Sequence, residues 1–195
     1  MMTRLEKQLE FIREIDKVKN IYRQTYLTDG QRKENDAEHS WHIAVMALLL
    51  KEYAPKADAS RVMAMVLIHD LVEIDAGDTF AYDPEGAKTK KARETACADR
   101  LFGILPEDQG HLIRELWDEF EEYETEDARY AHLLDNLQPI LLNDASGGRS
   151  WEEHKVDKSK VYKRNEKISD TSEEIFECMK EIIEKHAKLG HLGDR

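Results

Sequence analysis

Apolar residues recur at intervals of three and four along most of this chain, while the alternating runs that are typical of half-buried strands are nearly absent. Side chains at these intervals lie on one face of an α-helix, so each helical segment carries an apolar stripe. A chain of this kind buries its stripes by packing helix against helix. We therefore predict an all-α fold, a helical bundle with one core, because 195 residues suit a single domain.

The helices that this periodicity predicts cover most of the chain. The stretch VMAMVLIHDLVEI, residues 62–74, is apolar nearly all round and indicates a central helix that is buried on most faces. Asn35 followed by Glu38 resembles a capping box at the start of the helix that carries His39. Pro139 should bend the helix in which it lies. The expected helices span about residues 4–19, 36–50, 59–74, 85–102, 106–120, 126–143 and 169–188, with a polar loop over residues 26–35.

The bulk composition excludes several classes of protein. Apolar residues make up 41% and charged residues 36% of the chain, which is too apolar for a disordered protein and too charged for a membrane protein. Its apolar runs are far shorter than the roughly 18 residues that span a bilayer. The formal net charge of −12 argues against nucleic acid as a partner, because binding to its backbone needs clustered lysine and arginine.

Two observations predict a reducing, cytoplasmic location. Charges of both signs fill the N-terminal stretch, which therefore lacks the apolar segment of a signal peptide. The two cysteines, Cys97 and Cys178, form no CxxC pair and are typical of ordinary thiols. A small phosphate ester can still bind this acidic chain if local cations or a metal ion offset its negative field.

Three polar residues, His69, Asp70 and Glu73, interrupt the apolar helix near its end. An unpaired carboxylate in a dry interior is costly, so these groups need partners, and one divalent cation would satisfy more than one of them. Helical geometry places His69 and Glu73 on one face and rotates Asp70 away from His69 by about 100°. The alternative is ordinary polar capping of a helix end, and a His-Asp dipeptide alone does not exclude it.

A second imidazole and a second carboxylate complete a candidate metal site. His39 lies in EHSWH, and Asp135 lies in LLDNLQP, just before Pro139. This mixed set of nitrogen and oxygen donors suits Mn, Fe, Co, Ni, Zn or Mg better than a soft metal. A site with four protein ligands keeps positions open for water and substrate, so the ion can polarise a phosphoryl oxygen and acidify bound water.

The order His39, His69-Asp70, Asp135 resembles the H…HD…D signature of the HD-domain superfamily of metal-dependent phosphohydrolases. The stretches ENDAEHSWHIAVMALLL, LIHDLVEIDAGD and LLDNLQPILLN resemble the subgroup that includes the bacterial 5′-deoxynucleotidases. The resemblance covers about residues 5–185 and implies a single HD domain over residues 1–195 with a short polar C-terminal tail. It also implies that the four residues converge on a divalent metal site, and that the protein cleaves a phosphomonoester such as a (deoxy)nucleoside 5′-monophosphate. The sequence does not decide between one ion and two, and a single ion is favoured because Asp70 is followed by Leu-Val-Glu and the HHExxD extension of some HD-domain hydrolases is not visible.

The same resemblance implies roles for three further residues. Glu73 would act on the attacking water, which agrees with its place one turn beyond His69, where it could take or donate a proton. Asp78, in the AGD turn, would assist near the sugar hydroxyl. Arg23, in NIYRQTY, would hold the phosphate, because its planar fork grips phosphate oxygens in pairs. Arg32 and Lys33 remain alternatives for that last role.

We assign no catalytic or metal-binding role to the other histidines, the tryptophans or the basic run. We expect His42 and His132 to pack, and Trp117 and Trp151 to lie in the core or an interface. The basic run over residues 88–93 stays unassigned, and His111, His154, His186 and His191 are expected at the surface.

Other functions remain open from the sequence. The same site could act on a cyclic dinucleotide, an alarmone or a nucleoside triphosphate, or the chain could be a non-catalytic nucleotide-binding regulator. For partners, we expect a small phosphate ester and a second copy of the chain in a homodimer.

Overall fold

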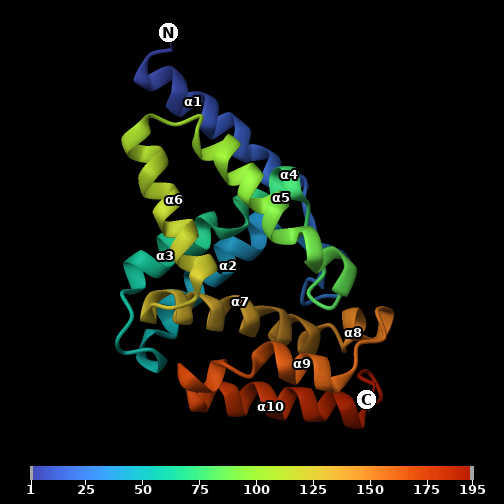
Figure 1. Cartoon of the computed structure of the whole chain (residues 1–195). Coiled ribbons are helices and arrows are strands. Elements are labelled where there is room, and N and C mark those ends of the chain that lie inside the picture. The colour runs from blue at the N-terminus through green and yellow to red at the C-terminus, as the bar shows by residue number, and fades with distance from the viewer. Residues whose placement is uncertain (1, 194–195) are drawn as a thin grey trace.

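The structure, a computed structural model, describes residues 2–193, and helices dominate it (Figure 1). The all-α prediction is therefore confirmed. The α-helices are α1 (Arg4–Ile15), α2 (Asp36–Leu49), α3 (Ala59–Ile68), α4 (Glu73–Ala76), α5 (Pro84–Phe102), α6 (Glu107–Glu122), α7 (Glu126–Ala145), α8 (Arg149–Glu153), α9 (Lys158–Asn165) and α10 (Glu173–Lys188). Short 3-10 turns are η1 (Asp16–Asn20), η2 (Lys51–Tyr53), η3 (His69–Val72) and η4 (Ile168–Asp170).

Local sequence signals fix several helix ends as expected. The Asn35 side chain accepts a hydrogen bond from the Glu38 backbone N–H at 3.0 Å, and the Glu38 carboxylate accepts one from the Asn35 N–H at 3.1 Å, so the capping box is confirmed. Gly77 ends α4 with a φ of 73°, a conformation that suits glycine. Helix α7 continues through Pro139 and remains helical to Ala145.

Some expected boundaries are wrong. The polar loop expected over residues 26–35 is partly a hairpin, in which β1 (Tyr22–Tyr26) pairs antiparallel with β2 (Lys33–Asn35). These strands are short and polar, so they lack the alternation that marks a strand. The first helix gives way to η1 at Asp16, the last begins only at Glu173, and α8 and α9 were not expected at all.

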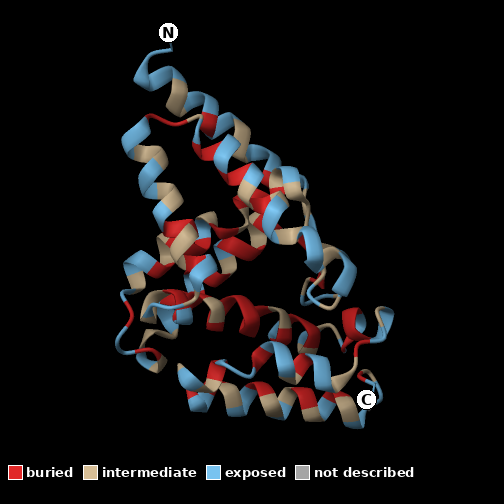
Figure 2. Cartoon of the chain, viewed as in Figure 1, coloured by how far each residue is buried: buried red, intermediate tan, exposed pale blue. Residues whose placement is uncertain are grey.

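The helices pack around two apolar clusters. The larger joins α2, α3, α7 and α10 and includes Ile43, Val66, Leu134 and Met179. The smaller joins α1, α5 and α6, which form an arm at the N-terminal side of the molecule (Figures 1 and 2). Leu192 also packs into the larger cluster, so the core extends past the limit of about residue 185 expected from the sequence.

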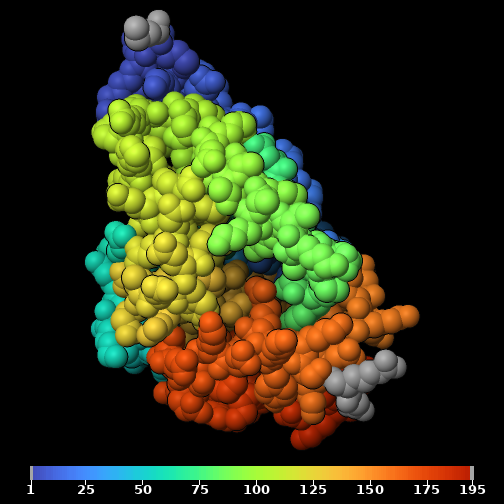
Figure 3. Space-filling model, viewed as in Figure 1, coloured from blue at the N-terminus to red at the C-terminus, as the bar shows by residue number. Residues whose placement is uncertain are grey.

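The arm and the larger core meet around a cavity of about 410 Å³. Figure 3 shows this hollow between α5, α6 and the segment of α8 and α9. Its walls come from residues as far apart in the chain as Arg23 and Asn165. Among the described residues, no helix combines the length and the apolar character that crossing a membrane requires.

Candidate metal centre

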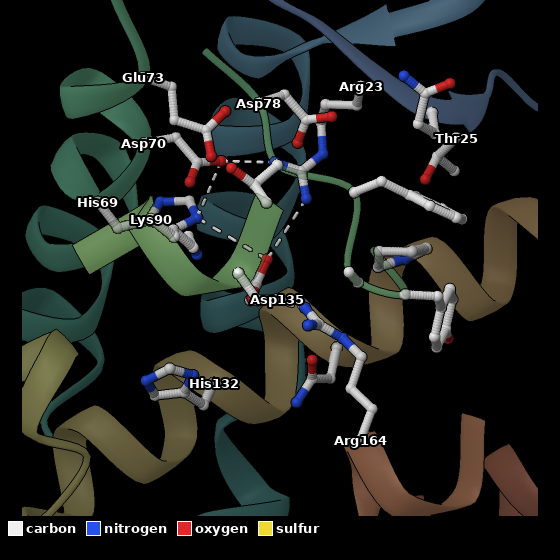
Figure 4. A pocket seen from close by; sticks show the side chains of 18 of the residues that line it. Arg23, Thr25, His69, Asp70, Glu73, Asp78, Lys90, His132, Asp135 and Arg164 are labelled. Atoms are coloured by element: carbon white, nitrogen blue, oxygen red, sulfur yellow. Dashed lines mark hydrogen bonds and ion pairs between the residues drawn. The ribbon is translucent and has the colours of Figure 1, made fainter. Parts of the chain in front are cut away.

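Three of the four residues that the sequence singled out as metal ligands, His69, Asp70 and Asp135, line the cavity, and the fourth, His39, is fully buried next to them. His39 comes from α2. His69 and Asp70 come from η3, and Asp135 comes from the middle of α7 (Figure 4). The ligand atoms of His39, His69 and Asp70 all lie within 4.8 Å of one another. Asp135 Oδ1 lies 3.0 Å from His39 Nε2 and 3.8 Å from His69 Nε2. The side chains therefore converge on one point.

Hydrogen bonds outside this point set the tautomers of both imidazoles. His69 Nδ1 lies 2.8 Å from the Val66 carbonyl oxygen and must donate to it, so Nε2 is the ring nitrogen that faces the centre. His39 Nδ1 lies 3.1 Å from Gln138 Oε1. The Gln138 amide donates to Glu34 Oε2 at 2.8 Å, so its oxygen faces His39 and accepts from Nδ1–H. His39 Nε2 is then a lone pair that faces the centre.

The resulting donor set fits a divalent cation. His39 Nε2 and Asp135 Oδ1, both acceptors in this protonation state, face each other at 3.0 Å, and His69 Nε2 is buried without a hydrogen-bond partner among the described residues. Acceptors placed this closely repel one another unless a cation lies between them. Two imidazoles oriented by outer hydrogen bonds, together with carboxylates, form the kind of site that first-row divalent metals prefer.

The end of α3 controls where Asp70 and Glu73 point. The α-helix tightens into the 3-10 turn η3 at His69, and residues three apart are eclipsed in such a turn. Glu73 therefore follows Asp70 around the axis, and Figure 4 shows the two carboxylates side by side. The expectation that Glu73 shares a face with His69, which assumed a continuous α-helix, is wrong in this detail.

Arg23 lies among the carboxylates at the edge of the centre. Its Nη1 donates to Asp70 Oδ2 at 2.6 Å and lies 3.5 Å from Asp36 Oδ1, while Nη2 is 3.7 Å from Asp135 Oδ1. Strand β1 carries Arg23 into this position, which explains why the hairpin matters to the site. The alternatives are placed elsewhere: Arg32 pairs with Glu38 at the surface, and Lys33 bonds to Gln24.

Burial and mutual repulsion shift the pKa values of the outer carboxyls upward. Desolvation raises the pKa of Glu34 to about 7 and, together with the charge of Asp70, that of Asp36 to about 8. Burial also raises the pKa of Glu73 well above its ordinary value, and it raises that of Asp78, which lies in the loop after Gly77. Burial therefore favours the protonated, neutral form of these carboxyls when no further cation lies beside them.

The inner groups shift according to their closest partners. Burial lowers the pKa of His39 to about 4, with a further contribution from Arg23. Burial alone would also lower the pKa of His69, but Asp70 and Asp135 outweigh it and raise the value to about 10. In the same way, burial opposes ionisation of Asp135, yet both imidazoles hold its pKa well below the usual range. In the metal-free protein these carboxylates therefore draw a positive charge toward the centre.

The remaining histidines divide between packing and surface. His132 stacks on Phe120, with ring centroids 4.0 Å apart, and its Nε2 lies 2.8 Å from the Phe120 carbonyl oxygen. His42 is half-buried, and His111 is exposed. The expectation of a surface position is wrong for His186, which is buried beside Trp151. Both ring nitrogens have partners there: Nδ1 lies 2.9 Å from His191 Nδ1, and Nε2 lies 2.9 Å from Asp144 Oδ1.

Sequence reasoning missed several residues of the site. Gln138 and Glu34 orient His39, and Asp36 contacts Arg23, although all three lie close to predicted ligands in the chain. Gln138 could have been found from its position, because it is a polar residue three positions after Asp135 on the mostly buried helix α7. Lys90, from the unassigned basic run, and Arg164, from an unexpected helix, also line the cavity.

Comparison with known proteins places this arrangement in a family. The sequence profile of the HD domain matches residues 15–176, a region that contains all four candidate ligands. The chain belongs to the HD domain family. Its match covers β1 through most of the first turn of α10, so the HD domain accounts for both the metal centre and the cavity walls.

Named relatives of this HD domain protein include deoxynucleotidases. The 5′-deoxynucleotidase HDDC2 of Bos taurus is 31% identical over 134 residues, which is 68% of this chain and 64% of the relative. The Homo sapiens 5′-deoxynucleotidase HDDC2 is 29% identical over 134 residues, 68% of this chain and 65% of the relative. The chain therefore spans slightly less than two thirds of the length of these relatives.

Solved structures share the whole fold. The crystal structure of a "predicted metal-dependent phosphohydrolase" from Magnetospirillum magnetotacticum MS-1 matches with a TM-score of 0.93 and 48% identity, covering 97% of this chain and 96% of that one. A conserved hypothetical protein from Pyrococcus furiosus matches with a TM-score of 0.61 at 24% identity, covering 92% and 99% of the two chains, and supports the fold alone.

Proposed function

We propose that this HD domain protein is a metal-dependent phosphohydrolase that cleaves a phosphomonoester, and that its substrate is a deoxynucleoside 5′-monophosphate. One observation carries the proposal: two imidazoles, each with Nε2 facing the same centre, and two carboxylates converge, and three of these four residues line a cavity. The names of the bovine and human relatives support the choice of a deoxynucleotide. The 48% identical phosphohydrolase supports the type of bond.

His39, His69, Asp70 and Asp135 would hold the metal ion. When bound, the ion supplies Lewis acidity toward a phosphoryl oxygen and toward water. Its identity is a proposal among Mn, Co, Mg, Ni, Fe and Zn, since nitrogen and carboxylate donors accommodate all of them. One ion is favoured, because the Arg23 guanidinium already fills the space among Asp36, Asp70 and Asp135 where a second cation would lie.

Glu73 would handle the proton of the reaction. Its side chain is buried beside Asp70 at the cavity wall, and Oε2 has no hydrogen-bond partner among residues 2–193. A carboxyl oxygen in this position can take a proton from the attacking water or return one to the leaving ester oxygen. The low exposure of Glu73 keeps bulk water from competing for that proton.

Arg23 and Asp78 would hold the substrate beside the ion. Arg23 keeps N–H groups that point toward the cavity even while Nη1 bonds Asp70, so its fork can grip a phosphate oxygen. Asp78 lines the same wall beyond Glu73, and we propose that its carboxylate accepts a hydrogen bond from a sugar hydroxyl.

The assembly of two copies remains a proposal as well. Leu5, Leu9 and Ile12 of α1 and Leu112 of α6 are exposed along the free side of the arm, and an apolar row of this kind is a feature of self-association surfaces. Size-exclusion chromatography with light scattering measures the mass directly. A monomer at every concentration tested would exclude the homodimer.

The decisive experiment is an activity screen. Purified protein is stripped of metal, reloaded separately with Mn, Co, Mg, Ni or Zn, and offered deoxynucleoside and ribonucleoside 5′-monophosphates, other phosphomonoesters, cyclic dinucleotides and nucleoside triphosphates. We expect metal-dependent release of inorganic phosphate, fastest from the deoxynucleoside 5′-monophosphates. Release only from diesters or triphosphates would replace the substrate class, and no release with any metal would favour a binding protein.

A further inference from the structure

Arg164 reaches Asp135, a candidate metal ligand, from the cavity. Among the described residues, three arginine or lysine side chains line the cavity: Arg23, Lys90 and Arg164. Arg23 donates a hydrogen bond to Asp70, and Lys90 lies 3.5 Å from the buried carboxylate of Glu94 on its own helix. Neither Lys90 nor Arg164 makes a hydrogen bond within residues 2–193, and Arg164 Nη2 lies 3.6 Å from Asp135 Oδ2.

The position of that contact links Arg164 to the metal centre. The Oδ1 atom of Asp135 faces His39 and His69, while the Oδ2 atom faces Arg164. Helix α9 brings the guanidinium to this point from the opposite side of the cavity to Arg23 (Figure 4). A ligand seated on the open side of the ion would therefore lie between two guanidinium groups.

The charge of the cavity makes such a cation necessary for an anionic ligand. Acidic side chains outnumber the arginine and lysine side chains of the lining by two to one, the acidic residues being Asp70, Glu73, Asp78, Glu94, Glu121 and Asp135. A phosphate dianion entering this cavity gains from each cation that lines it. Arg164 lines the cavity, and its side chain keeps 36% of its surface exposed.

We propose that Arg164 is a second phosphate-binding residue, which donates from its planar fork to the non-bridging oxygens of the ester on the side away from Arg23. The proposal rests on the proposed function and extends it, because it assigns helix α9 a direct contact with the substrate. A bidentate fork suits two oxygens of one phosphate, whereas lysine offers a single point of charge.

A purely structural role for Arg164 predicts something different. If Arg164 only holds Asp135 in place, its loss should weaken metal binding and leave phosphate affinity per metal-loaded site unchanged. If it binds phosphate, its loss should spare the metal and weaken the anion. Measuring both affinities on the same variants separates the two roles.

The experiment uses inorganic phosphate as the probe. The intact protein, loaded with the divalent metal that it retains best, is titrated with phosphate by isothermal calorimetry as wild type, Arg164→Gln, Arg164→Lys and Lys163→Gln. Lys163 is an exposed cation on the same helix, so its replacement matches the change in net charge away from the cavity. Metal affinity is measured separately for each variant.

We expect Arg164→Gln to raise the phosphate dissociation constant by about 10- to 100-fold, the value of one charge-assisted interaction, with metal affinity unchanged. Arg164→Lys should recover part of the loss, and Lys163→Gln should behave as wild type. An unchanged phosphate affinity in Arg164→Gln, a fall in metal affinity that accounts for the loss, or no phosphate binding by the wild type would each overturn the proposal. Because the titration needs no turnover, it separates this result from a failure of the proposed phosphatase activity.

Discussion

Replacing Gln138 by methionine tests how the protein prepares His39 for a metal ion. Gln138 and His39 are both fully buried, and Gln138 Oε1 accepts the His39 Nδ1–H at 3.1 Å. Methionine keeps the length of the side chain but removes this acceptor. Without it, the imidazole of the metal-free protein gains most by moving its proton to Nε2 and donating to Asp135, which lies 3.0 Å away. A metal ion must then reverse that tautomer.

The size of the effect follows from the buried N–H group. Metal binding to the variant leaves the His39 Nδ1–H without an acceptor in a dry site, which costs about 1–3 kcal/mol. Each 1.4 kcal/mol is about a tenfold change in affinity, so the metal dissociation constant should rise by about 5- to 150-fold. Losses of about 10- to 100-fold are typical when the outer partner of a metal-bound histidine is removed.

The assay is competition for the metal with a chelator of known affinity, combined with urea unfolding of the metal-free protein. Tyr130→Phe is the matched control, because Tyr130 lies on the same helix and donates a buried hydrogen bond to the Ala47 carbonyl oxygen at 3.0 Å. It should lower the free energy of unfolding by about 1 kcal/mol without changing metal affinity. Wild-type metal affinity in Gln138→Met would refute the assignment of the tautomer.

Three further predictions address the centre and its surroundings. Asp135→Ala should abolish both metal retention after dialysis and turnover, since it removes the carboxylate that faces His39 at 3.0 Å; unchanged metal content would remove it from the ligand set. Glu73→Gln should keep the metal and lower kcat by roughly 10²- to 10⁴-fold, and a wild-type rate would contradict its role with the proton. Burial raises the pKa of Glu94 to about 7, so the folded state keeps a proton that the unfolded chain releases above about pH 4.5. Glu94 should therefore contribute up to about 3 kcal/mol to the fall in stability between pH 4.5 and 8, beside the contributions of other buried carboxyls such as Glu34 and Asp36, and Glu94→Gln should make the slope in urea unfolding shallower; an identical slope in both proteins would show that Glu94 does not contribute.

The sequence predicted the parts of this molecule that depend on local patterns. Neighbouring residues alone determine the capping box of Asn35 and Glu38 and the apolar helix before His69. Both features are present in the structure. The convergence of His39 and Asp135 depends on how α2 packs against α7, which no local pattern contains. Resemblance to a family supplied that expectation.

Other features depend on tertiary contacts and could not be predicted. Strand β1 is short and lacks an apolar alternation, so no local pattern marked it, and it places Arg23 among buried carboxylates. The tightening of α3 at His69 changes which residues share a face, and α-helical spacing alone misplaced Glu73 for that reason. Arg164 and His186 lie where they do because distant segments supply their partners, Asp135 and Asp144.

The meeting of donors from α2, η3 and α7 also couples the ion to folding. An unfolded chain keeps these segments apart, so a metal ion that binds only the folded state acts as a clamp across the bundle and shifts the folding equilibrium by mass action. At a free concentration one hundred times its dissociation constant, the ion would add about 2.7 kcal/mol of stability. A series of melting curves recorded with different metals and no substrate would therefore rank their affinities, and a chelator would lower the melting temperature of the whole protein.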